Sequence, residues 1–129
     1  MAIRKTFLAA SAFAALGAQA DGYVIAHLTV NVAPEEVRQI FTGNMQFSGA
    51  RRLVPVDNGA VQGDFLYKVV RMDPDRYNAV WTRKAFREGV APPPVLLSDQ
   101  EVMDFVRRTP GAIGYVGTNP GSANVILKY

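Results

Sequence analysis

Four consecutive residues between a short apolar strand and a helix are the best placed in this chain for binding chemistry. Asn58, Gly59, Ala60 and Val61 follow the apolar segment 53–56 and Asp57, and a helical pattern begins at Val61. In α/β proteins a small polar turn at the start of a helix is a common ligand site, because its free backbone N–H groups and the helix dipole favour an anion. We therefore expect Asn58, Gly59, Ala60 and Val61 to bind a small anion.

Catalytic and metal-binding machinery is not visible in the sequence. The chain has one His and no Cys, and its carboxylates are spaced as they are at helix starts rather than as in a metal site. His27 lies in an apolar segment with neither a nucleophile nor a second ligand nearby, which is typical of a structural histidine. No G-x-S-x-G motif occurs. We expect a non-enzymatic protein without a cofactor or a metal.

The elements that must position the turn follow from apolar periodicity, caps and breakers. Pro34 and Pro74 are suited to first helical positions, and Ser98-Asp99-Gln100-Glu101 is a capping box. Gly43 and Gly89 are suited to helix ends. The expected strands are 23–32, 53–56, 112–116 and 125–129, and the expected helices are 34–42, 61–71, 74–88 and 99–109.

This order of elements predicts an α/β sandwich, with helices on both faces of a small sheet. A turn of about six residues joins the last two strands, which favours antiparallel pairing between them. The helix after Pro74 carries Tyr77, Val80, Trp81 and Phe86 at roughly helical spacing. Core packing is the simpler interpretation of this stripe, and a platform for a sugar or a base is the alternative.

Residues 1–20 have the pattern of a cleaved signal peptide. Arg4 and Lys5 precede an apolar run, and Ala18-Gln19-Ala20 is an A-x-A cleavage site. The run is too short to span a bilayer comfortably, so we expect export, with residues 21–129 as one periplasmic domain and no membrane span after cleavage. Those residues carry 12 basic and 11 acidic side chains, a balance that argues against a nucleic-acid partner.

Three segments resemble, in order and rough spacing, the phosphate-binding periplasmic proteins of ABC transporters. They are Ile40-Phe41-Thr42-Gly43, the strand-turn-helix 54–65, and Pro110-Gly111-Ala112-Ile113-Gly114-Tyr115-Val116. The resemblance covers nearly all of residues 21–129 but about one lobe of that family's two. It implies a three-layer α/β/α sandwich with a small mixed sheet, a single lobe of a type II periplasmic binding protein.

The family's turn carries an Arg and a Ser-Gly-Thr run that bind phosphate, and this chain departs from that pattern. It has Asp57, Asn58, Gly59, Ala60 and Val61 at the turn, so the hydroxyls and the Arg are absent. Two functions stay open: weak binding of phosphate or another small anion, linked to ABC transport, or contact with a protein partner or a second copy after loss of solute binding. For such a contact we expect the loop 44–52 and the run 92–94 to be the surfaces.

Overall fold

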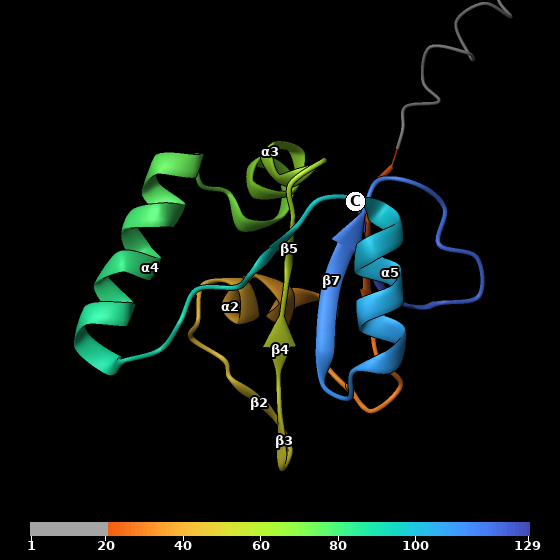
Figure 1. Cartoon of the computed structure of the whole chain (residues 1–129), viewed down its shortest axis with the longest axis horizontal. Coiled ribbons are helices and arrows are strands. Elements are labelled where there is room, and N and C mark those ends of the chain that lie inside the picture. Colours follow the sequence, from red (N-terminus) through yellow and green to blue (C-terminus); the bar gives the residue numbers. More distant parts are fainter. Residues whose placement is uncertain (1–20) are drawn as a thin grey trace, which may run out of the picture.

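The computed structural model describes residues 21–129, and the expected signal peptide, residues 1–20, lies outside them. A four-stranded sheet has the strand order β4-β7-β1-β8. Its strands β4 and β7 lie between α4 and α5 in Figure 1. Two small two-stranded sheets, β2-β3 and β5-β6, extend the four-stranded sheet. The strands are β1 (Tyr23–Ala26), β2 (Phe47–Ser48), β3 (Arg51–Arg52), β4 (Val54–Pro55), β5 (Asp57–Asn58), β6 (Val95–Leu96), β7 (Ala112–Val116) and β8 (Asn124–Lys128).

The helices lie where caps and breakers predict them. The 3₁₀ turn η2 (Pro34–Glu36) leads into α2 (Val37–Phe41), and α3 (Gln62–Phe65) continues as a π-helical turn, η3 (Leu66–Val70). The two longest helices, α4 (Pro74–Glu88) and α5 (Asp99–Arg108), start at Asp73 and Ser98, whose side chains accept hydrogen bonds from backbone N–H groups of the first turn. Gly43 and Gly89 end their helices at φ of +78° and +70°.

Alternation along β7 gives the sheet two buried faces, because successive side chains of a strand point to opposite sides. Ile113 and Tyr115 pack with α2, α3 and η3, while Ala112 and Val116 pack with α5. Gly114 points to the α5 side, where an added Cβ would lie 2.8 Å from a methyl group of Val102. The absent side chain lets α5 approach β7 closely, and the expected three-layer α/β/α arrangement is confirmed (Figure 1).

Two sequence-based expectations about the strands are wrong. The last two strands do not pair with each other: β1 lies between β7 and β8 and is antiparallel to both. The first strand is also shorter than the expected 23–32, because the chain turns after Ala26, where the N–H of Val30 donates to the carbonyl of His27 at 2.9 Å. The six-residue connection is short enough for a hairpin, but its length does not reveal that β1 lies between β7 and β8.

Only part of the aromatic stripe on helix α4 lies in the core. Tyr77 and Trp81 are buried, in agreement with core packing, and the indole N–H of Trp81 donates to the carbonyl of Phe41 at 3.0 Å. Phe86 is 91% exposed, which contradicts its placement in the core. The extended segment after Gly89 runs from the far end of α4 back to the sheet (Figure 1) and supplies β6, the partner of β5.

Candidate functional site

The strand-turn-helix segment singled out by the sequence lies where β5 leads into α3. Asp57 and Asn58 form β5, which pairs in parallel with Val95 and Leu96 of β6. Both β5 side chains are buried, at 1% and 0% exposure, while the next two residues, Gly59 and Ala60, are exposed. The turn is therefore a surface feature that rests on two buried polar side chains.

The backbone N–H groups expected to bind an anion have acceptors within the chain. Gly59 donates to the carbonyl of Leu96 at 2.7 Å, and Val61 donates to the carbonyl of Asn58 at 3.2 Å. The N–H of Ala60 donates to the side-chain oxygen of Asn58 at 3.0 Å, an Asx-type turn. An anion here would have to replace these bonds, and binding by Asn58, Gly59, Ala60 and Val61 stays a prediction.

The carboxylate of Asp99, at the start of α5, accepts hydrogen bonds from three groups in two separate parts of the chain. Asn58 Nδ2 donates to Oδ1 at 2.8 Å, Thr118 Oγ1 donates to Oδ2 at 2.8 Å, and the Gly117 N–H lies 3.2 and 3.1 Å from the two oxygens. We call these three groups the donor cluster. Asn58 Nδ2 also donates to the Tyr115 carbonyl at 3.0 Å.

The donor cluster adjoins the turn. A Cβ added at Gly117 would lie 2.9 Å from a methyl group of Val61 and 3.9 Å from Asp99 Oδ2. Sequence reasoning missed Asp99, because the capping box explains its presence fully. Its donors lie 18 to 41 residues away in the chain, and no local pattern indicates contacts of that range.

A second buried carboxylate, Asp57, lies beneath the turn. Tyr115 Oη donates to its Oδ1 at 2.7 Å, and Tyr77 Oη donates to its Oδ2 at 2.9 Å. Burial raises the pKa of the Asp57 carboxyl, and the two phenol hydrogen bonds offset part of that rise. Burial, with the nearby Asp57 charge, also raises the pKa of both phenols, so they remain donors. This cluster ties β5 to α4 and β7.

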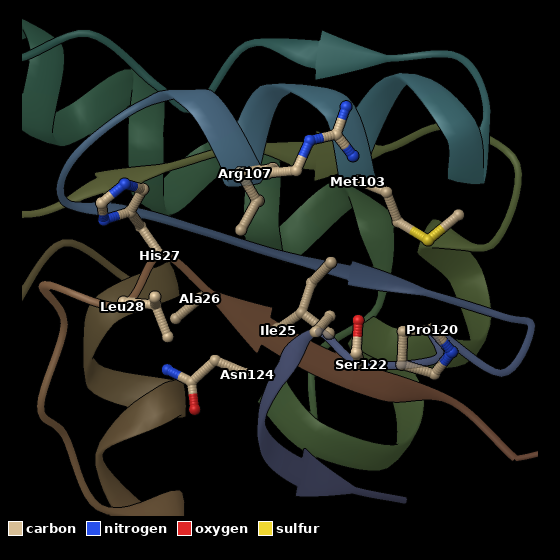
Figure 2. Close-up of a pocket in the computed structure, with 11 residues that line it drawn as sticks. Ile25, Ala26, His27, Leu28, Met103, Arg107, Pro120, Ser122 and Asn124 are labelled. Carbon is tan, nitrogen blue, oxygen red and sulfur yellow. The ribbon is translucent and has the colours of Figure 1, made fainter.

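The hollow drawn in Figure 2 lies on the α5 side of the sheet and has a volume of about 240 Å³. Its walls are largely apolar, with Ile25 and Val106 buried beneath it, and His27 at its edge bonds to the Thr29 hydroxyl at 2.9 Å.

Within residues 21–129, no three His, Cys, Asp or Glu side chains are grouped to hold a metal ion. No helix in that range is long and apolar enough to cross a bilayer.

Comparison of the fold with solved structures finds two of similar fold. PstS from Borrelia burgdorferi superimposes with a TM-score of 0.51 at 16% identity, over 83% of this chain and 47% of the other. An ABC-type phosphate transport receptor from Vibrio cholerae gives 0.50 at 13% identity, over 83% and 46%. The chain has the fold of one lobe of a type II periplasmic binding protein. It spans about half the length of these structures.

At these identities the likeness shows the fold of a type II periplasmic binding protein and nothing finer. No family model matches the chain, and no curated protein matches its sequence. The fold expected from the resemblance is thus confirmed, and the function has to be argued from the site itself.

Proposed function

We propose that this chain is an exported, non-enzymatic receptor-lobe domain that does not bind phosphate at its turn and acts through contact with another protein. One observation carries the proposal: the N–H groups of Gly59, Ala60 and Val61 all donate to acceptors within the chain. Phosphate binding at a helix start depends on free N–H donors. The Vibrio cholerae protein of similar fold is a transport receptor, which supports a non-catalytic role.

The surface around the turn favours a protein rather than an ion. Val95 and Leu97 are 51% and 72% exposed, and both lie within 3.7 Å of the position that a Cβ on Gly59 would take. Asp57 and Asp99 add negative charge beneath and beside the turn, which opposes an anion. Exposed apolar side chains that gather beside small residues are typical of contact surfaces.

The proposal includes export of the chain to the periplasm. Residues 1–20 have the signal-peptide pattern, and the Vibrio cholerae protein of similar fold is an ABC-type transport receptor, so we infer that residues 21–129 are periplasmic. A partner protein and a second copy of the chain are both compatible with the apolar surface. Light scattering on the wild type and on Leu97→Glu separates them, because only self-association changes the mass of the purified protein.

Calorimetry with inorganic phosphate on residues 21–129 tests the proposal. We expect no binding heat up to millimolar phosphate, since each N–H of the turn already has an acceptor. Micromolar affinity would contradict the proposal. It would support the second candidate, a weak binder of phosphate or another small anion at Asn58, Gly59, Ala60 and Val61.

The second candidate is favoured by the exposure of Gly59 and Ala60 and by the likeness to phosphate receptors. If binding is found, Gly59→Pro locates it, because proline removes an N–H at the turn. The same change removes the 2.7 Å bond to Leu96, so the circular dichroism of the variant must match that of the wild type.

A further inference from the structure

The donor cluster of Asn58 Nδ2, Gly117 N–H and Thr118 Oγ1 brings together three donors from β5 and from the chain after β7. All three lie within 3.2 Å of the Asp99 carboxylate. Asp99 is only half-buried and Thr118 is exposed, so solvent reaches this place. Several neutral donors that converge on one negatively charged oxygen pair are the arrangement a small oxyanion requires.

We propose that Asp99 is the residue that closes this lobe to free oxyanions, its carboxylate occupying donors that phosphate or sulfate would otherwise take. The inference rests on the proposed function and deepens it, since it names the group that excludes the anion. Two effects act together. The donors are already bonded, and a second anion near them would meet the like charge of Asp99, which disfavours its binding.

Within residues 21–129, Asp99 is the one acidic side chain to which the donor cluster bonds. The four ion pairs found in residues 21–129 involve other carboxylates, and neither Asn58 nor Thr118 bonds to another acidic side chain. Asn58 is itself fixed, because its Nδ2 also donates to the Tyr115 carbonyl and its Oδ1 accepts from Ala60. Removing Asp99 therefore leaves at least the Asn58 donor in place.

Calorimetry with phosphate and with sulfate on Asp99→Ala and Asp99→Ser tests the inference. We expect one or both variants to bind phosphate or sulfate at least about tenfold more tightly than the wild type does. A tenfold change in affinity corresponds to about 1.4 kcal/mol of binding free energy. Two controls separate occupancy from charge. Asp104→Ala removes a charge from the same helix, α5, without freeing the cluster, so it should not gain binding. Asp99→Asn removes the charge but keeps one acceptor oxygen among the donors, so it should gain less affinity than Asp99→Ala.

A purely structural role for Asp99 predicts lower stability without any anion binding. If Asp99→Ala or Asp99→Ser is folded by circular dichroism and takes up neither ion, the inference is overturned while the proposed function stands. If the wild type already binds at micromolar phosphate, both fail. Adding Thr118→Ala to Asp99→Ser removes one donor and should weaken the gained binding; an unchanged affinity would place the anion elsewhere and overturn the inference.

Discussion

Asp57 is a buried carboxylate whose charged form is penalised by desolvation. It is 1% exposed, accepts hydrogen bonds from Tyr115 and Tyr77, and makes no ion pair among residues 21–129. Desolvation penalises its charged form, which is why its pKa is raised. A buried charge of this kind is retained at the expense of stability, and its phenol partners make the ionised form tolerable.

The raised pKa of Asp57 sets the sign of a pH effect. Between its ordinary pKa of about 3.9 and its raised pKa in the folded chain, Asp57 holds a proton that the unfolded chain has lost, so its contribution to stability falls as pH rises through the folded pKa. Urea unfolding of Asp57→Asn from about pH 4 upwards should lack this fall. An identical pH slope in wild type and variant would contradict the assignment.

Asp104 provides the matched control on an exposed carboxylate. Hydrogen bonds from Gln100 and Arg107 lower the pKa of its carboxyl, so its contribution is present above the ordinary pKa and is lost as pH falls through the folded value. Asp104→Asn should therefore change the pH dependence of unfolding in the direction opposite to Asp57→Asn. The same direction in both variants would show that a general charge effect dominates.

Among the aromatic ring pairs of residues 21–129, the closest joins α3 to β7. The rings of Phe65 and Tyr115 stack with centroids 3.7 Å apart, and Phe41 meets both edge-on. Phe65→Ala should lower the free energy of unfolding by about 3 to 5 kcal/mol, because it removes a fully buried ring. Phe86→Ala, the same change on a 91% exposed ring, should stay within about 0.5 kcal/mol. Equal losses would contradict the packing described.

The starts of α4 and α5 depend on single side chains. Asp73 Oδ1 accepts from the Arg76 N–H at 2.8 Å, and Ser98 Oγ accepts from the Glu101 N–H at 3.2 Å. Asp73→Ala and Ser98→Ala should each cost about 1 kcal/mol of stability in thermal or urea unfolding. Asp75→Ala, within the first turn but not at the cap, should cost less; a larger loss there would refute the cap assignment.

These helix boundaries are also what the sequence predicts best, because caps and breakers act within a few residues. Asp73, Ser98, Gly43 and Gly89 lie at the expected helix ends. Strand order and the contacts of Asp99 depend on residues far apart in the chain, and no local pattern reveals them. For the candidate site, the sequence predicts the position of the turn but not that its N–H groups are already bonded.

At the scale of the molecule, export is the first property to test. The pattern of residues 1–20 predicts cleavage after Ala20, so mass spectrometry of the periplasmic fraction should find an N-terminus at Asp21. A protein that retains Met1 and sediments with membranes would contradict the prediction. Ala18→Arg, which places a large charged side chain in the cleavage motif, should block processing and serves as the control.

We propose that the N–H groups of the turn and of Gly117 bind no phosphate, because acceptors of the chain itself already occupy them. A ¹H–¹⁵N correlation spectrum of residues 21–129, titrated with inorganic phosphate to millimolar concentration, observes those N–H groups directly. We predict that the amide signals of Gly59, Ala60, Val61 and Gly117 do not move beyond the general effect of added salt. Saturable shifts confined to these amides would contradict the account.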